Sequence, residues 1–177
     1  MKNLLLLGLM IMVTLSSCTQ KQRYTQKSPE IDIYKQVIKD YELRNWESLA
    51  NHYADTAKVL NNTTKKHEQT VTQLINQYKK DAMLFSSWNF VGKESEYEMV
   101  VTDKGQTWVN FWGLWQGKLI ANNVLYEVPV HVTAQFIDGE IVREHGYWDS
   151  SRLVLDIQKM QQSVTDKSKE KPKQITK

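Results

Sequence analysis

The feature that most constrains the fold is a change in the spacing of apolar residues at about residue 88. Before this point apolar side chains recur every three to four positions, which predicts amphipathic helices. After it they alternate, which predicts strands with one buried face. Helices are expected over 29–44, 46–53 and about 71–85, with a short strand over 57–60. The first helix has a clear start, because Ser28 can cap it and Pro29 suits its first turn.

The alternating half of the chain divides into four expected strands, at 94–103, 106–117, 122–138 and 140–149. Asp138-Gly139 separates the last two and is a strong signal for a tight hairpin. Because the helices come first and the strands follow as a block, the sequence predicts an α+β fold in which three N-terminal helices pack on one face of an antiparallel sheet. A short closing helix is expected over 152–160.

A two-residue turn at Asp138-Gly139 would fix the register of the last hairpin. Ile137 then lies opposite Glu140, and each further pair lies one step outward. One face of the longer strand is apolar and is expected to be buried: Tyr126, Val128, Val130, Val132, Ala134 and Phe136. In this register the last strand turns four polar side chains to the same side: Arg143, His145, Tyr147 and Asp149.

Two interpretations of these four polar side chains remain open. In the first, Asp149 caps the closing helix, His145 bonds to a backbone carbonyl and Arg143 reaches solvent at the rim. In the second, they line a cavity between the sheet and the helices. The second interpretation predicts a ligand pocket formed by Tyr34, Trp112, Val128, Val130, Val132, Arg143 and Tyr147.

The strand expected over 106–117 carries large apolar side chains on both faces, with Trp112 on one face and Trp115 on the other. A sheet with one solvated face needs only one apolar face. The second face is therefore expected to meet another subunit or to extend the ligand cavity, and a homodimer is the expected assembly.

The first 18 residues predict a bacterial lipoprotein precursor. Lys2 precedes an apolar run from Leu4 to Val13, which suits a signal peptide and is too short to span a bilayer. Leu15-Ser16-Ser17-Cys18 resembles the lipobox of bacterial lipoproteins, in which the cysteine becomes the acylated N-terminus. Cys18 is the only cysteine, so lipidation, for example with palmitate, gives it a role that disulfide pairing cannot. The alternative is an ordinary signal peptide followed by a free cysteine.

This prediction divides the chain into four parts. Residues 1–17 are expected to be removed, and Cys18 is expected to anchor the protein to a membrane of the cell envelope after export across the inner membrane. Residues 18–28 would form a polar tether, residues 29–160 the domain, and residues 161–177 a disordered polar tail, because they lack apolar periodicity.

Charge and motifs exclude several function classes. Between residues 29 and 160, 14 Lys and Arg stand against 18 Asp and Glu, a net charge of −4, so the domain lacks the basic face of a nucleic-acid binder. The four histidines show no paired spacing for a metal, and no Gly-rich phosphate loop is present. Neither a metal nor a cofactor is expected.

Two segments of the domain resemble a known family. Residues 41–56 (YELRNWESLANHYADT) and 136–149 (FIDGEIVREHGYWD) are similar to the first-helix end and the last hairpin of the nuclear transport factor 2-like superfamily. The similarity is to its SnoaL-like branch of polyketide cyclases and ketosteroid isomerases, and it covers about residues 29–160. It implies a cone, in which a curved sheet wraps around helices, with a ligand pocket at the open end and often a dimer.

The resemblance also implies site residues. Tyr41 matches the tyrosine that donates a hydrogen bond to the developing oxyanion in ketosteroid isomerases. Asn61 stands where those enzymes carry their aspartate base, and asparagine cannot accept the proton. Asp149 matches the aspartate that acts as acid or base in the cyclase branch, with His145 beside it as a proton-transfer partner.

Three functions are consistent with this pattern. The first is a lipid-anchored binding module that holds a small, largely apolar ligand in its cone. The second is an enzyme of isomerase, cyclase or dehydratase type that uses Asp149, His145 and Tyr41. The third is a non-catalytic module whose aromatic outer face docks a partner.

Overall fold

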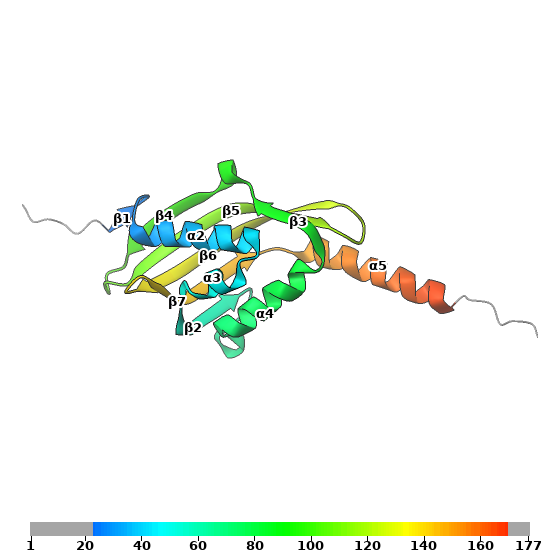
Figure 1. The fold of residues 1–177 in the computed structure, drawn as a ribbon, viewed down its shortest axis with the longest axis horizontal. Helices are drawn as coiled ribbons and strands as arrows, with labels where there is room; N and C mark the ends of the chain where they lie inside the picture. The colour runs from blue at the N-terminus through cyan, green and yellow to red at the C-terminus, as the bar shows by residue number, and fades with distance from the viewer. Residues whose placement is uncertain (1–22, 170–177) are drawn as a thin grey trace, which may run out of the picture.

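The computed structural model describes residues 23–169, in which α2 and α3 lie across one face of a curved sheet (Figure 1). In chain order the elements are β1 (Tyr24–Thr25), α2 (Pro29–Leu43), α3 (Trp46–Ala50), β2 (Tyr53–Asn61), α4 (Val71–Ala82), β3 (Phe85–Phe90), β4 (Glu96–Val101), β5 (Thr107–Leu119), β6 (Leu125–Ile137), β7 (Glu140–Trp148) and α5 (Ser151–Lys169). Within this part of the chain no helix is both long and apolar enough to cross a membrane.

The sheet has the strand order β1-β4-β5-β6-β7-β2. The long strand β5 pairs with β6 along one edge, and its other edge is shared by β4 along the first half and β3 along the second. The predicted α+β fold with a curved sheet is confirmed. The sheet is mixed rather than wholly antiparallel, because β2 runs parallel to β7. These two strands are far apart in the chain, so no hairpin dictates their direction.

Helix α2 begins as the sequence predicts. The Ser28 hydroxyl accepts a hydrogen bond from the Ile31 amide at 3.2 Å, and Pro29 opens the first turn. The helix ends where Arg44 adopts a left-handed conformation with φ of 61°. It turns one buried face toward the sheet: Ile31, Tyr34, Val37 and Asp40. This face carries both apolar side chains and the polar groups discussed below.

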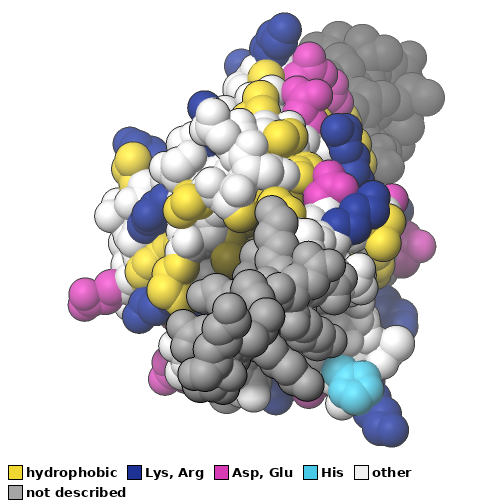
Figure 2. Space-filling model, turned by 90° about the vertical axis from the view of Figure 1, so that its right-hand side faces the viewer, with side chains coloured by type: hydrophobic (Ala, Val, Ile, Leu, Met, Phe, Trp, Pro, Cys, Tyr) yellow, Lys and Arg dark blue, Asp and Glu magenta, His cyan; other side chains and the backbone are white. Residues whose placement is uncertain are grey.

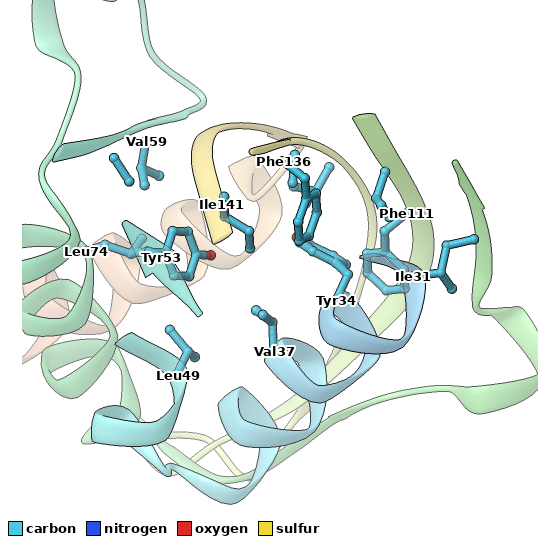
Figure 3. Close-up of a cluster of buried hydrophobic side chains, with 14 of the residues drawn as sticks. Ile31, Tyr34, Val37, Leu49, Tyr53, Val59, Leu74, Phe111, Phe136 and Ile141 are labelled. Atoms are coloured by element: carbon cyan, nitrogen blue, oxygen red, sulfur yellow. The ribbon is translucent and has the colours of Figure 1, made fainter. Parts of the chain in front are cut away.

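The main core lies between the helices and the inner face of the sheet (Figure 3). Ile31 and Val37 from α2, Leu49 from α3 and Leu74 from α4 meet the sheet residues Phe111, Phe136 and Ile141. Burying one Leu, Ile or Phe side chain stabilises a fold by about 1.5–3 kcal/mol. A second cluster around Trp115 and Tyr126 packs against α5, and the Tyr126 hydroxyl donates to Asp156 at 3.0 Å. This contact fixes the start of α5 beside the sheet.

Some element boundaries differ from the sequence prediction. Residues 85–90 form β3, which completes the edge of β5 next to β4, whereas a helix was expected to reach residue 85. Helix α3 ends at Ala50, and β2 already begins at Tyr53. Helix α5 continues to Lys169 where a polar tail was expected, since neither Gly nor Pro interrupts the chain there. Residues 170–177 lie outside the described part.

The hairpin between β6 and β7 begins as predicted and then departs from the expected register. Asp138 and Gly139 both have positive φ, at 50° and 84°, and Ile137 pairs with Glu140. Phe136 still pairs with Ile141. A β-bulge then leaves Val142 without a residue opposite, so that Gln135 pairs with Arg143 and Ala134 with Glu144.

This bulge overturns the predicted orientation of the last strand. Because side chains alternate along a strand, one extra residue reverses the face of every later position. The polar side chains expected inside lie on the outer face instead, at Arg143, His145 and Tyr147. The inner face carries Glu144, Gly146 and Trp148, and the Glu144 side chain is buried with the residue only 2% exposed.

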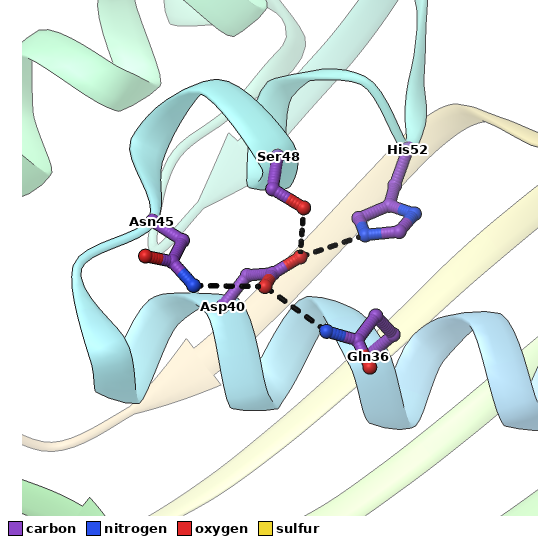
Figure 4. A network of polar contacts seen from close by, with 5 residues as sticks. All are labelled: Gln36, Asp40, Asn45, Ser48 and His52. Carbon is purple, nitrogen blue, oxygen red and sulfur yellow. Dashed lines mark hydrogen bonds and ion pairs between the residues drawn. The ribbon is translucent and has the colours of Figure 1, made fainter.

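A buried carboxylate ties the end of α2 to α3 and to the turn that precedes β2 (Figure 4). Asp40 accepts hydrogen bonds from the Ser48 hydroxyl at 2.7 Å, the His52 Nε2 at 2.9 Å, and the side-chain amides of Gln36 at 3.0 Å and Asn45 at 3.5 Å. Burial raises the pKa of Asp40, but these hydrogen bonds together lower the pKa below its ordinary value. Asp40 therefore stays ionised and holds these three segments together.

Replacing Asp40 by Ala should lower the free energy of unfolding by about 1–3 kcal/mol, because it leaves several part-buried donors without their acceptor. Urea denaturation measures the change. In the unsubstituted protein this stabilisation is present above the ordinary pKa of an aspartate and is lost as the pH falls through the lowered pKa. Replacing the exposed Asp55 by Ala is the control and should change stability by less than about 0.5 kcal/mol. Equal effects of the two substitutions would contradict the assignment.

Candidate functional site

A cavity of about 440 Å³ lies between the inner face of the sheet and helices α2, α4 and α5. The lining reaches the surface beside the end of α4 and the first turns of α5, where Leu84 and Val154 are exposed. Figure 2 looks at the end of the molecule from which α5 leaves and shows apolar side chains at the surface there, with Lys and Arg among them. The size and mostly apolar walls match those of pockets that hold small organic molecules.

Glu144 forms the polar floor of this cavity. The Tyr53 hydroxyl donates to Glu144 Oε2 at 2.6 Å, and the Tyr34 hydroxyl donates to the same oxygen at 3.3 Å. Tyr34 comes from α2, Tyr53 from the start of β2 and Glu144 from β7. Three elements therefore converge on one carboxylate inside the cone.

Burial controls the acid–base properties of this group. It raises the pKa of Glu144 above the ordinary value, and the donors Tyr53, Tyr34 and Asn61 act in the opposite direction without cancelling it. Burial and the nearby carboxylate likewise raise the pKa values of Tyr34 and Tyr53, so both hydroxyls keep their protons. Glu144 therefore gains a proton more readily than an exposed glutamate.

Asn61 lies next to this carboxylate, on β2 opposite Gly146. Its Oδ1 atom is buried and has no hydrogen-bond partner among residues 23–169. A Cβ atom at position 146 would overlap Asn61 Oδ1, so the lack of a side chain at Gly146 makes room for the amide. The amide is thus held against the cavity with one acceptor unused.

An aromatic cluster forms one side of the cavity. The Tyr41 ring lies 5.0 Å from the Tyr78 ring centroid, 5.8 Å from Trp88 and 6.2 Å from Phe90. Burial raises the pKa of Tyr41 well above the ordinary range, so its hydroxyl is a neutral donor. Trp115 Nε1 is buried beside the Tyr41 hydroxyl, and its N–H acts against the effect of burial on the Tyr41 pKa without cancelling it.

The ionisable carboxyl groups in the cavity lining are those of glutamate and aspartate. The lining contains the carboxylates of Glu144 and of Asp81 near the mouth, and it contains no Lys, Arg or His among the described residues. Burial raises the pKa of Asp81, while Gln77 and Lys80 act in the opposite direction. In residues 23–169 no group of three His, Cys, Asp or Glu side chains could hold a metal ion.

The structure brings five of the predicted site residues to this cavity and leaves five outside it. Those that line it are Tyr34, Tyr41, Val128, Val130 and Val132. Those that do not are Trp112, Arg143, His145, Tyr147 and Asp149.

The predicted catalytic pair lies away from the cavity. His145 packs against Trp108 on the outer face of the sheet, with ring centroids 6.2 Å apart. Asp149 is exposed after the last strand and accepts a hydrogen bond from the Ser151 amide at 2.9 Å, which lowers its pKa. The helix-capping interpretation of Asp149 is therefore the one that the geometry supports.

The outer face carries a row of stacked rings. His131 lies 4.9 Å from Trp112 and 6.3 Å from Tyr147, measured between ring centroids. Trp112 is 38% and Tyr147 53% exposed, although both were expected inside the pocket, whereas Trp115 is buried and lines the cavity. That the outer face meets a second subunit stays a prediction.

Sequence reasoning missed the residues that give the cavity its chemistry. Strict alternation from the hairpin turn placed Glu144 outside, and no local signal marks the bulge at Val142. Tyr78 belongs to the expected apolar face of its helix, but its hydroxyl carried no distinguishing signal. Tyr53 was expected at a helix end and instead begins β2. Asn61 was singled out only through the family resemblance.

No family model matches the sequence, and no curated protein sequence matches it significantly. Solved structures are similar in fold. A protein with a ketosteroid isomerase-like fold from Catenulispora acidiphila, solved in complex with trimethylamine, gives a TM-score of 0.55 at 11% identity, covering 68% of this chain and 87% of that one. A candidate polyketide cyclase from Xanthomonas campestris pv. campestris gives 0.59 at 11% identity, covering 74% and 98%.

A nuclear transport factor 2-like protein of unknown function from Burkholderia pseudomallei gives a TM-score of 0.56 at 9% identity, covering 72% of this chain and 96% of that one. Identities this low establish the fold alone. The chain thus has the cone fold shared by nuclear transport factor 2-like proteins, SnoaL-like polyketide cyclases and ketosteroid isomerase-like proteins.

Proposed function

We propose that the protein binds a small, largely apolar organic molecule in the cone, with the polar group of that molecule at Glu144. The observation that carries the proposal is the cavity of about 440 Å³, whose walls are mostly aromatic and aliphatic and whose floor is a buried carboxylate. A core that served stability alone would fill such a space with side chains.

Polar side chains at the cavity could orient a bound molecule. The Asn61 amide and the Trp115 indole both line the cavity, and Asn61 Oδ1 makes no hydrogen bond within residues 23–169. A ligand that donates a hydrogen bond to this oxygen would satisfy it.

The raised pKa of Glu144 favours a second candidate function, proton transfer to or from the bound molecule. In an isomerase- or cyclase-type reaction Glu144, rather than Asp149, would be the acid or base, and Tyr41 would polarise a carbonyl. The two candidates differ in the fate of the ligand. A binding module returns it unchanged, whereas an enzyme converts it and loses this conversion, but not binding, when Glu144 becomes Gln.

We also propose that Cys18 anchors the domain to a membrane of the bacterial envelope. Residues 1–22, including the signal peptide and Cys18, lie outside the described residues, so the proposal rests on the lipobox resemblance of residues 15–18. The tether is short, since the structure already begins β1 at Tyr24.

Cell labelling tests the anchor. In a bacterial host supplied with radiolabelled palmitate, the protein should take up the label and sediment with membranes, because acyl chains anchor it. The Cys18→Ser variant should carry no label. The Ser17→Ala variant, which keeps a small residue before the cysteine, should be labelled normally. Equal labelling of the Cys18→Ser variant would exclude this site.

Filling the cavity should abolish ligand binding. Val130→Trp places a large side chain on the inner face of β6, so a molecule that copurifies with the protein in native mass spectrometry should be lost. Glu127→Trp adds the same side chain on an exposed position of the same strand and should leave the ligand bound. Thermal unfolding must show that both variants fold. A ligand retained by folded Val130→Trp would place the site elsewhere.

Ionisation of Glu144 should lower the free energy of unfolding at high pH. The raised pKa of Glu144 means that the folded protein holds this proton more tightly than the unfolded chain does. The stabilisation that comes from the protonated Glu144 side chain is therefore fully present below the ordinary pKa of a glutamate. It is lost as the pH rises through the raised pKa of Glu144. Each unit of elevation corresponds to about 1.4 kcal/mol. Glu144→Gln cannot ionise, so in urea denaturation it should gain stability over the parent as the pH rises. A parallel pH dependence of the two proteins would contradict the raised pKa.

A further inference from the structure

The charges around the cavity restrict the ligand more than its size does. Glu144 lies at the floor and Asp81 near the mouth, and the lining holds no cationic side chain in residues 23–169. No Lys, Arg or His of this part of the chain forms an ion pair with Glu144. An anionic ligand would meet only like charge, which raises the cost of binding it.

The hydrogen bonds to Glu144 come from neutral donors, so they supply no counter-charge to its ionised form. Tyr34 and Tyr53 both donate to Oε2, and both hydroxyls remain neutral. Neutral donors stabilise an ionised carboxylate, but a buried charge without a counter-charge remains unfavourable. A cation placed beside this carboxylate would supply the missing charge.

The aromatic side of the cavity favours the same ligand charge. The rings of Tyr41, Tyr78, Phe90 and Trp115 line it, and the face of an aromatic ring attracts cations. The adjoining cluster already holds one cation, because the Arg44 guanidinium lies 4.2 Å from the Trp88 ring. A desolvated cation gains more from such rings than an exposed one does.

We propose that the cone selects ligands with a cationic head and an apolar body, of the alkylammonium class, with the head between Glu144 and the aromatic rings. This inference rests on the proposed binding function. The apolar body occupies the wall formed by Val128, Val130 and Val132 and reaches toward α5. Asn61 Oδ1 accepts a hydrogen bond from the N–H of a protonated primary amine, whereas a quaternary head uses the rings and the carboxylate alone.

Cation binding must then compete with a proton for Glu144. The groups that face this carboxylate are Tyr34 from α2, Tyr53 and Asn61 from β2, and Tyr78 from α4. Burial raises the pKa of Tyr78 as well, so none of these groups ionises near neutral pH. The affinity for a cation falls when the pH is lowered through the pKa of Glu144, while that for a neutral ligand of the same length does not.

Three ligands with one chain length and different head charges test the proposal. Octyltrimethylammonium, octanol and octanoate are titrated into the purified protein by isothermal titration calorimetry, at neutral pH and again in acid. The cation should bind about tenfold more tightly than the alcohol, and octanoate should bind more weakly than both. The advantage of the cation should shrink in acid.

Variants test whether the preference for the cation depends on the Glu144 carboxylate. Glu144→Gln keeps the size and the acceptor for both tyrosines and should bring the cation within about threefold of the alcohol. Glu140→Gln makes the same change at an exposed position of β7 and should keep the full preference. Val130→Trp should weaken all the ligands that occupy the cavity.

The outcomes separate this inference from the function on which it rests. Octanol or octanoate binding as tightly as the cation, with binding lost in Val130→Trp, overturns the cationic head and leaves the apolar pocket in place. A preference that survives Glu144→Gln also overturns it. Absence of binding by all three ligands counts against the proposed function itself.

Discussion

The hydroxyls of Tyr34 and Tyr53 both donate to Glu144 Oε2, and these two hydrogen bonds join α2, β2 and β7 inside the cone. A carboxylate in an apolar interior is tolerated only when donors or counter-charges surround it. Here neutral donors satisfy one oxygen, and no cation of the described residues reaches the group. The space between sheet and helices therefore keeps a polar floor, which distinguishes it from the filled core around Ile31 and Phe111 at the other end.

Glu144 lies on the inner face because of the bulge at Val142, which the alternation of apolar residues does not reveal. The alternation after residue 88, the helical spacing before it and the Asp138-Gly139 turn were sufficient to predict an α+β fold, most strand positions and the apolar face of β6. The bulge at Val142 is set by how β7 pairs with both β6 and the irregular strand β2, which is tertiary information. Because the predicted register lacked the bulge, it placed His145 on the inner face and Glu144 on the outer face, the reverse of their positions in the structure. This error left the fold prediction correct and moved the predicted site outside the cavity.

The family resemblance adds a comparison between adjacent strands. It assigns position 61 to the base of ketosteroid isomerases, where this chain has an amide. In the parallel pairing of β2 with β7, Asn61 lies opposite Gly146, two residues beyond Glu144. The neighbouring strand carries the carboxylate of Glu144, and both side chains line the same cavity.

The two buried carboxylates of this domain, Asp40 and Glu144, have pKa values shifted in opposite directions, which indicates different roles. Asp40 has four side-chain donors, and its pKa is lowered, so its charge is fully used in joining α2, α3 and the turn that precedes β2. Glu144 is equally buried, but its pKa is raised, so the fold would be more stable with a neutral group there. A buried charge that destabilises the ligand-free protein has a function if it interacts with a bound ligand. The cavity beside Glu144 is lined by aromatic rings. A cationic ligand bound there would offset the desolvation penalty of the buried carboxylate.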